Sequence, residues 1–488
     1  MVAVEVPTMA TRKTKEQDAQ SNARRQKVLE LLEQEVGEQT GGDSTFEERN
    51  DVAVDVLKDV LWRREDADLR GAVTTAAEVK IEGKRYGRLN QSSSATYYGR
   101  WGSHDVEEPL YREVGVHNGP TTKPLEQRMG MIARHMTPDL ARVMGELSGD
   151  RSSREVEGTM RATGLVPPSR AFIERRMKQM AGEIVEQIET LEEAARETTP
   201  LPVEVASVSC GLDRFSVRMS EPATAQSVPA PHRTEPYERT PPPPKEHRYH
   251  KAWVGSTTVY DNEGSELHTW RYSVEADADP NALAHRVAND VAWILREYPA
   301  IPVHCIQDAA PELRALPEAL AEVLPATVTP CELVDFEHLA KDYLDEVVDA
   351  CEPEGDPNNM KGWYRTELLR DDHAIDRIWR SLREKRKKLP ESNTRERKAV
   401  GAALSYIRKR KQKMRYASLY LAGLPIGSGA TEGTCWQMQR RVQRPGQSWE
   451  TPGLRGTLAI RALVLSERWS AAWKPYAAAH RKTVQHMN

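Results

Sequence analysis

Paired cysteines are missing from this chain, and their absence argues against two kinds of cysteine-dependent structure. No Cys-x-x-Cys pair occurs, and the first 209 residues contain no cysteine at all. The five cysteines are Cys210, Cys305, Cys331, Cys351 and Cys435. This scatter argues against a zinc ribbon and against a disulfide framework. We therefore expect no zinc, and cysteines that stay reduced and pack as small apolar side chains.

Long apolar runs are missing as well. The longest fall far short of the ~18 residues that a membrane-spanning helix needs. The N-terminus is polar and charged, without the apolar core of a signal peptide. We expect a protein with no membrane partner, cytoplasmic and associated with the nucleoid. Because 488 residues exceed one typical domain, several domains are expected.

A strong net charge is also lacking, but the charges are unevenly distributed. The formal net charge is −4, whereas residues 361–415 hold 19 Lys and Arg against 7 Asp and Glu. A basic block inside an acidic protein suggests a phosphate-binding surface, and a solvated helical face is the alternative. The DNA contacts predicted in this block are Arg383, Lys385, Arg386, Arg408, Lys409, Arg410 and Lys411.

Residues 1–198 are predicted to be mainly helical, with one small β element. Apolar spacing indicates helices over residues 22–36 and 46–70, within an N-terminal helical region 1–75. Short strands separated by turns follow in a β-rich element, residues 76–120. In region 121–198, a helix ending at Gly164 and another from Arg170 form a helix-turn-helix pattern, for which a structural or dimerising hairpin is the alternative. The DNA contacts predicted there are Arg170, Arg175, Arg176 and Lys178.

The order of elements after residue 199 predicts an α/β core. Strand-like runs are expected at residues 203–219, 251–260, 267–274, 301–306 and 326–334, and helices at 280–298 and 311–323. A Pro-rich insert, residues 221–248, interrupts the first part of this core, residues 199–350. A basic all-α insertion, residues 351–423, precedes the last part of the core and the C-terminal helices, residues 424–488. Three antiparallel strands and then alternating helices and strands resemble the RNase-H-like core.

Three acidic residues stand out by their positions in this order. Asp213 lies on the first strand-like run and Asp308 follows the fourth. Glu432 follows a Gly-rich loop in the stretch 424–436, which reads Leu-Pro-Ile-Gly-Ser-Gly-Ala-Thr-Glu-Gly-Thr-Cys-Trp. Each acid alone has a simpler explanation, because carboxylates are common at strand ends and favoured at helix starts. Together they can form a hard-oxygen site for two Mg²⁺ ions, a chemistry used in DNA strand cleavage and transfer.

These residues together resemble a DDE-type insertion-sequence transposase of the Kra type, a group whose catalytic domain is related to that of Mutator-like transposases. The resemblance covers about residues 200–475, and the N-terminal half resembles the family only loosely. The matching pieces are residues 208–217, the hairpin 251–272, Ala288 to Asp290, Gln307 to Glu312, Asp335 to His338, Arg415 and Tyr416, Gly423 to Gly429, Glu432, Arg441, Gly446, Trp449, and Arg461 to Trp469. The chain departs from the pattern at Gln443 and Pro445, in the Pro-rich insert, and in the missing N-terminal cysteine pairs.

The resemblance implies a mobile-element enzyme that binds the terminal inverted repeats of its insertion sequence and cleaves and transfers DNA strands. Asp213, Asp308 and Glu432 would be the catalytic DDE residues and hold two Mg²⁺ ions, for which Mn²⁺ can substitute. Asp335 and His338 would support the active site. The predicted DNA contacts near the cut are Trp436, Arg440, Arg441 and Arg444, with core packing as the alternative for Trp436.

The partners implied are double-stranded DNA, as element ends and as target, and a second copy of the chain, because two ends must be paired. We expect a homodimer. Two alternatives stay open: a catalytically inactive, transposase-derived DNA-binding protein, and another RNase-H-like DNA nuclease.

Overall fold

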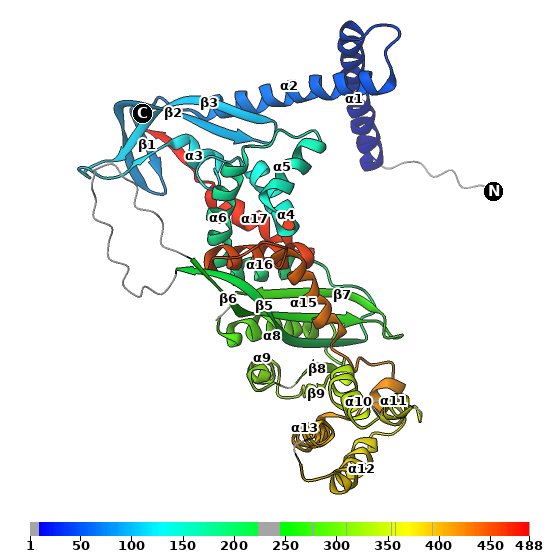
Figure 1. The fold of residues 1–488 in the computed structure, drawn as a ribbon. Coiled ribbons are helices and arrows are strands. Elements are labelled where there is room, and N and C mark those ends of the chain that lie inside the picture. Colours follow the sequence, from blue (N-terminus) through cyan, green and yellow to red (C-terminus); the bar gives the residue numbers. More distant parts are fainter. Residues whose placement is uncertain are drawn as a thin grey trace, which may run out of the picture. The chain divides into compact units, whose positions relative to one another are not determined.

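The computed structural model describes residues 9–222, 245–275, 278–308, 310–352, 354–356, 358–392 and 394–487, with side chains from residue 22 onward. Within these ranges the fold is mixed α/β with two five-stranded sheets, so the predicted α/β class is confirmed (Figure 1). The chain divides into two compact units. Unit 1 comprises residues 1–143, 153–173 and 477–488, and unit 2 comprises residues 144–152 and 174–476.

Unit 1 begins with two helices, α1 (Met9–Gln39) and α2 (Phe46–Ala72). Helix α2 lies where the sequence predicts it, whereas α1 is longer than the predicted residues 22–36 and already begins at Met9. A capping box starts α2: the Glu48 N–H donates to Thr45 Oγ1 at 3.2 Å, and the Thr45 N–H donates to Glu48 Oε2 at 2.7 Å. The apolar residues that predict this helix stay largely outside the core, since Leu57 is 41% and Val60 56% exposed. The periodicity therefore predicts the helix correctly but not the burial of its apolar face.

The sheet of unit 1 has the order β10-β1-β2-β3-β4. Its strands are β1 (Glu78–Ile81), β2 (Lys84–Gly99), β3 (Gly102–Glu113), β4 (Thr121–Thr122) and β10 (Val484–Met487). Glu82 and Gly83 adopt positive φ angles of 49° and 83° and turn the chain between β1 and β2. The C-terminal strand β10 pairs antiparallel with β1, a partnership between chain ends that the sequence does not predict.

The helical segment that follows contains α3 (Pro124–Met129), α4 (Pro138–Asp150), α5 (Ser153–Ala162), α6 (Arg170–Glu186) and α7 (Ile188–Thr198). The predicted helix ending at Gly164 is α5, and Gly164 has the positive φ of 79° that ends a helix readily. Helix α6 begins at Arg170 as predicted. Both α4 and α6 have residues in each unit.

The sheet of unit 2 has the order β7-β6-β5-β8-β9. Strands β5 (Ser207–Pro222), β6 (Lys245–Tyr260) and β7 (Glu266–Val274) are antiparallel, whereas β8 (Val303–Gln307) and β9 (Cys331–Val334) run parallel to β5. The predicted hairpin is confirmed, with Gly264 at a φ of 78° in its turn. Strand β9 is shorter than predicted, because the Val328 N–H donates to the Pro325 carbonyl at 2.8 Å and closes a turn there.

Most of the predicted Pro-rich insert lies outside the described residues. Its two ends are strand rather than loop, since Glu221 pairs with Glu246 and Pro222 with Lys245 between β5 and β6. Residues 221–222 and 245–248 of the predicted insert are therefore strand, six positions in all. Cross-strand hydrogen bonds pair the backbone N–H and C=O groups there, whereas in a loop these groups would be hydrogen-bonded to water.

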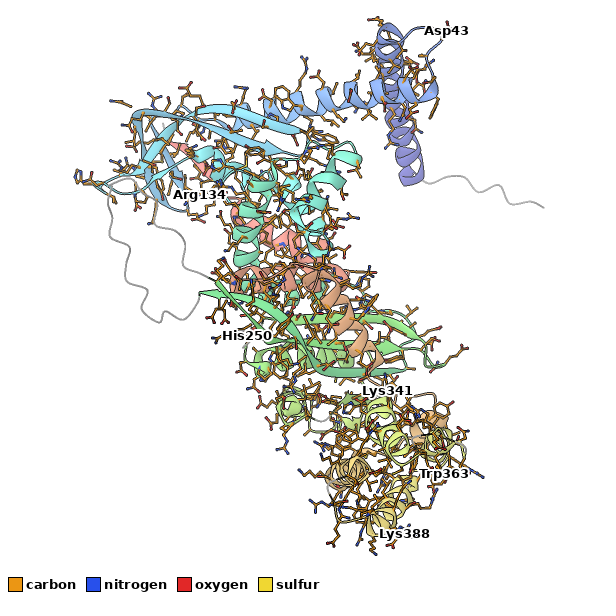
Figure 2. All side chains as sticks on the ribbon, viewed as in Figure 1. Asp43, Arg134, His250, Lys341, Trp363 and Lys388 are labelled. Atoms are coloured by element: carbon orange, nitrogen blue, oxygen red, sulfur yellow. The ribbon has the colours of Figure 1, made fainter. Side chains whose placement is uncertain are left out.

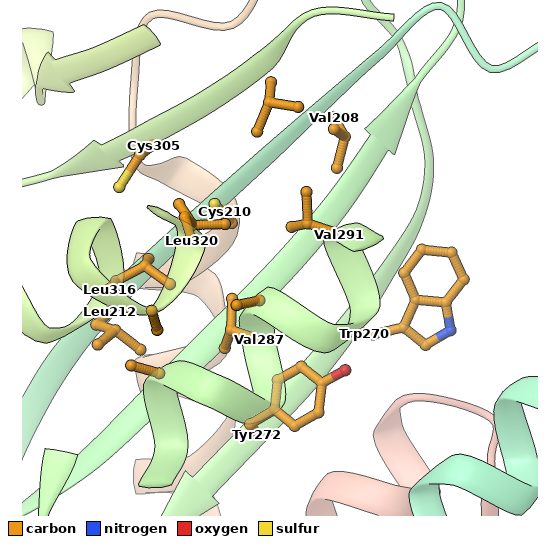
Figure 3. Close-up of a cluster of buried hydrophobic side chains, with 14 of the residues drawn as sticks. Val208, Cys210, Leu212, Trp270, Tyr272, Val287, Val291, Cys305, Leu316 and Leu320 are labelled. Carbon is orange, nitrogen blue, oxygen red and sulfur yellow. The ribbon is translucent and has the colours of Figure 1, made fainter. Parts of the chain in front are cut away.

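The main core of unit 2 lies between the sheet and the helices α8 (Pro280–Glu297) and α9 (Ala315–Val323) (Figure 3). The short turn η1 (Pro311–Arg314) leads into α9. Helix α8 starts where predicted, because the Asp279 side chain accepts from the Asn281 N–H and Pro280 fills the first turn. Residues of this core include Val208, Cys210, Leu212, Trp270, Tyr272, Val287, Val291, Leu316 and Leu320. The opposite face of β5 packs on α15 (Gly429–Val442) and α16 (Thr451–Leu465), and α17 (Trp469–His480) follows.

Between β9 and α15 the chain is helical, as predicted. The elements are η2 (His338–Asp345), α10 (Glu346–Cys351), α11 (Met360–Arg370), α12 (Ala374–Lys388), α13 (Arg395–Arg410), η3 (Lys411–Lys413) and α14 (Ala417–Leu421). They share a core of their own around Leu368, Ile378 and Val400. Figure 2 labels Trp363 on α11 and Lys388 at the end of α12. None of the helices in the described ranges has the length and apolarity that a membrane crossing requires.

Candidate active site

Strand alternation directs Asp213 toward α15. Successive side chains of a strand point to opposite faces, and Val208, Cys210 and Leu212 of β5 lie in the core beneath α8. Asp213 therefore points to the opposite face, the one that α15 covers. Gly211 on this face lets the helix approach, since a Cβ there would lie 2.6 Å from Thr431 Oγ1. The close packing of β5 and α15 thus depends on a glycine two residues before the first predicted acid.

Asp308 directly follows β8, the parallel neighbour of β5. The register pairs Cys210 with Cys305, and extending it by three residues sets Asp213 opposite Asp308. The Asp308 carboxylate accepts from the Ala310 N–H at 2.9 Å. Its backbone carbonyl accepts from the Tyr406 hydroxyl of α13 at 2.8 Å. The second predicted acid is therefore held by its own loop and by a helix of the insertion.

Glu432 lies in the first turn of α15, and the loop before it is anchored by Asp335. Ser428 Oγ donates to Glu432 Oε1 at 3.1 Å. The Ser428 N–H donates to one oxygen of the buried Asp335 carboxylate, and the His338 N–H donates to the other at 2.7 Å. Asp335 thus joins the Gly-rich loop to the start of η2.

Asp213 has two hydrogen-bond donors and no ion-pair partner. The Cys435 thiol donates to Oδ2 at 3.1 Å and the Arg214 N–H to Oδ1 at 2.7 Å. The Arg214 guanidinium pairs instead with Glu312. Across the described part of the chain, no Lys or Arg forms an ion pair with any of the four carboxylates Asp213, Asp308, Asp335 and Glu432.

Neighbouring carboxylates act on the pKa values of Asp213 and Glu432. Burial raises the pKa of Asp213, and the negative charge of Asp308 raises it further. Burial also raises the pKa of Glu432, and the charges of Asp335 and Asp213 add to that rise. A cluster of like charges without a cation favours protonation, or the binding of an external cation. The negative charge of these carboxylates therefore suits the binding of a cation.

The chemistry of the donors fits a hard divalent cation, since carboxylate oxygens are the ligands that Mg²⁺ and Mn²⁺ prefer. Within the described ranges, no three His, Cys, Asp or Glu side chains converge closely enough to enclose a metal ion. Asp213, Asp308 and Glu432 are thus brought together electrostatically without being closed around one point.

An aromatic cluster borders these acids, and the sequence does not predict it. Tyr343 of η2 stacks on Tyr406 of α13, with ring centroids 3.9 Å apart and an interplanar angle of 16°. The His338 ring meets both rings edge-on, at 5.5 and 5.7 Å, and His338 Nδ1 lies 2.8 Å from Asp342 Oδ2. Arg410 covers the outer side, 4.3 Å from the Tyr406 centroid. Burial raises the pKa of Tyr406, so its hydroxyl remains a donor to Asp308.

The predicted DNA contacts on α15 and just after it have different surroundings. Trp436 is 57% exposed, with the Arg440 guanidinium 4.8 Å from its ring centroid. Arg441 is buried at 6% exposure, lies over Trp449 and donates to the Ser148 carbonyl at 3.3 Å. Arg444 donates to the Asp150 carbonyl at 2.8 Å. Trp436 and Arg440 therefore face solvent, whereas Arg441 has the surroundings of a structural residue.

The predicted contacts on α6 and in the insertion also differ in their surroundings. Lys178 pairs with Glu450 at 3.2 Å, and Arg176 is half-buried. Lys385 pairs with Glu352 at 3.9 Å and Lys411 with Asp376 at 2.8 Å. Besides Lys178 and Lys411, the exposed predicted contacts are Arg170, Arg175, Arg383, Arg386, Arg408 and Lys409.

Two matching pieces of the sequence meet as a buried ion pair. Arg468 Nη2, at 1% exposure, lies 2.8 Å from Asp290 Oδ2, at 0%. Asp290 also accepts from the Tyr272 hydroxyl, and Arg196 lies 3.0 Å from its other oxygen. Asp290 and Arg468 therefore hold α8 to the start of α17 instead of joining the acid cluster.

Comparisons with known proteins identify no relative of this chain. No protein-family model, curated protein or solved structure matches it. The interpretation of the acid cluster therefore rests on its own geometry and charge.

Proposed function

We propose that this chain is a DDE-type DNA transposase that binds the ends of its insertion sequence and catalyses DNA strand cleavage and strand transfer. The observation that carries the proposal is the approach of Asp213, Asp308 and Glu432 from a strand, a strand end and a helix start. The sheet order β7-β6-β5-β8-β9 supports it, because three antiparallel strands followed by two parallel ones is the order expected of an RNase-H-like core. An all-α insertion between β9 and α15 fits the same layout.

In this proposal the three acids are the catalytic carboxylates and the cation ligands. Bound Mg²⁺, or Mn²⁺ in its place, would supply charge stabilisation and an activated oxygen nucleophile. Cys435 and the Arg214 N–H orient Asp213, and Tyr406 holds the backbone of Asp308. Asp335 fixes the loop that carries Glu432. Cleavage by water and transfer by a DNA 3′-hydroxyl need no covalent protein–DNA intermediate, so no Ser or Tyr nucleophile is assigned.

The uncompensated charge argues against an inactive, transposase-derived DNA-binding protein. Carboxylates that repel one another without a compensating cation destabilise a fold and persist where function uses them. Asp213 and Glu432 both have raised pKa values, first through burial and then through neighbouring carboxylates. Double-stranded DNA, a homodimer that pairs two element ends and a nucleoid location belong to the same proposal.

The test is Mg²⁺-dependent cleavage of DNA carrying the ends that flank this gene. Asp213→Ala, Asp308→Ala and Glu432→Ala should each lower cleavage at least a hundredfold while leaving DNA binding within about threefold. Glu318→Ala, which removes an exposed acid of α9 in the same unit, should cleave like the wild type. Full cleavage by Glu432→Ala would refute the assignment of the third acid. Binding without cleavage by the wild type would favour the inactive DNA-binding protein.

A further inference from the structure

A basic groove of about 790 Å³ lies between α12 and α13. Arg383 and Arg386 line it from α12, and Lys398 and Arg408 from α13. A fifth cation, Arg397, completes the positive lining, and Glu391 is the only carboxylate among the lining residues that the structure describes. The volume matches a site for one or two nucleotide units rather than for a metal ion.

The positions on α13 set this groove apart from the acid cluster. Lys398, Gly401, Ser405 and Arg408 recur every three or four residues, so they share one face of the helix. Tyr406, which reaches Asp308, lies five residues after Gly401 and thus about 140° around the helix. Gly401 brings α13 close to α12, since a Cβ there would lie 3.8 Å from the Arg386 guanidinium. The groove and the acid cluster occupy different faces of one helix.

The groove cations differ from their neighbours in lacking carboxylate partners. Lys387 pairs with Glu384 at 2.7 Å and Arg395 with Glu346 at 3.3 Å, in addition to the pairs of Lys385 and Lys411. Within the ranges that the structure describes, Arg383, Arg386, Lys398 and Arg408 form no ion pair. Arg397 is used internally, donating to the Leu389 and Pro390 carbonyls at 3.1 and 3.0 Å. Four unpaired cations on two facing helices would be stabilised by a polyanion.

Trp379 forms part of the lining and provides a probe inside the groove. The Arg383 guanidinium lies 4.9 Å from its ring centroid. The indole Nε1 is buried and has no hydrogen-bond partner among the described residues. An anion that draws Arg383 away from the ring would change the surroundings of the indole and hence its fluorescence.

We propose that this groove binds consecutive phosphates of a DNA strand, at a site separate from the acid cluster. Three of the four unpaired cations are arginines, whose planar forks match phosphate oxygens. The inference rests on the proposed function for its choice of DNA, since a free nucleoside triphosphate offers the same chemistry. Among the DNA contacts predicted in the insertion, it assigns phosphate binding in the groove to Arg383, Arg386 and Arg408, and it adds Lys398 to them. The ion-paired Lys385 and Lys411 would contribute less to the affinity for DNA.

The experiment compares two variants of the full chain that each lose four positive charges. The groove variant carries Arg383→Gln, Arg386→Gln, Lys398→Gln and Arg408→Gln. The matched control carries Lys385→Gln, Lys387→Gln, Arg395→Gln and Lys411→Gln, all in ion pairs. Affinity for a labelled 30-base-pair duplex is measured by fluorescence anisotropy at several salt concentrations. The groove variant should bind at least tenfold more weakly, with a salt slope smaller by about 3 to 4, because each lost phosphate contact reduces it by about 0.9.

The control should bind within threefold of the wild type, and equal losses in both variants would overturn the inference. ATP and tripolyphosphate are titrated against Trp379 fluorescence in the same buffer. If ATP quenches the fluorescence and added duplex does not reverse the quenching, the groove would be a nucleotide site instead of a DNA site. All eight changes lie on α12, α13 or η3, and thermal melting checks that both variants fold. If either misfolds, Lys398→Gln with Arg408→Gln is compared with Lys385→Gln with Lys387→Gln.

Failure of this inference differs from failure of the proposed function. A groove variant that binds DNA normally, beside a wild type that cleaves element ends, would refute the groove and keep the transposase. A groove variant that loses binding, beside a wild type that never cleaves, would keep the groove and refute the transposase.

Discussion

The Cys435 thiol donates a hydrogen bond to Asp213 Oδ2 at 3.1 Å, so α15 both carries Glu432 and orients the acid on β5. Cys435 follows Glu432 by three residues, which sets both side chains on neighbouring positions of the helix surface. Burial raises the pKa of Cys435, and the adjacent Asp213 charge raises it further, so the residue stays a neutral donor. One helix thus positions two of the three predicted acids.

Replacing this donor should move the pH dependence of cleavage. Cys435→Ala removes a hydrogen bond that lowers the pKa of Asp213, so the carboxylate would protonate at higher pH. The lost hydrogen bond is worth about 1 kcal/mol, so the acidic side of the curve of cleavage rate against pH should shift by less than one pH unit. At a given pH on that side, the cleavage rate should be about fivefold lower. Cys435→Ser keeps a donor and should restore the wild-type profile. Identical pH profiles for the Ala variant and the wild type would contradict this role.

Neutralising Asp213 should stabilise the protein while abolishing its activity. A carboxyl whose folded-state pKa is raised binds protons more tightly when folded, so its ionisation destabilises the fold at neutral pH and ceases to do so in acid. Asp213→Asn should therefore raise the free energy of unfolding by about 1 kcal/mol at pH 7.5. The gain should shrink toward pH 4. Urea denaturation at both pH values measures it, with Glu318→Gln as the exposed control. A destabilised Asn variant at pH 7.5 would count against a strained carboxylate.

His304 should make the fold sensitive to acid. It is 1% exposed, neither ring nitrogen has a hydrogen-bond partner in the described ranges, and burial lowers its pKa from 6.5 to about 4. Between these values the unfolded chain binds a proton that the folded chain excludes, so stability falls as the pH falls. From pH 7 to pH 5 the loss is about 2 kcal/mol. His304→Leu should remove this part of the pH dependence, measured as the difference between the two unfolding curves. Parallel curves for wild type and variant would show that His304 is protonated in the fold.

The buried ion pair of Arg468 and Asp290 should be costly to break. Arg468→Met leaves the Asp290 carboxylate with less compensation at 0% exposure, and removing one partner of such a pair costs about 3 to 5 kcal/mol. Arg395→Met breaks an exposed pair with Glu346 and should cost less than about 1 kcal/mol. Chemical denaturation of both variants gives the comparison. A cost below about 1 kcal/mol for Arg468→Met would mean that Arg196 alone compensates Asp290.

Elements with complete local signals can be predicted from the sequence. The β6–β7 hairpin has its turn residues between Asp261 and Gly264, and α8 has a cap at Asp279 and a proline in its first turn. Where the predictions are wrong, the structure of the segment depends on residues far away in the sequence. Residues at the ends of the Pro-rich insert become strand because β5 and β6 pair there, and Leu57 and Val60 of α2 stay exposed although their spacing is that of an apolar helix face.

The sequence by itself determined the α/β class, the helical character of residues 360–421 and which acids to examine, because periodicity, turn residues and charge are local properties. Only the tertiary structure decided which polar groups meet. Tyr406 reaches Asp308 across 98 residues of sequence, and Ser428 reaches Asp335 across 93. It also decided that Arg441 and Lys178 are engaged internally while Arg383 and Arg408 face an open groove. Such contacts form only when elements far apart in the sequence pack together, and local propensities do not encode that packing.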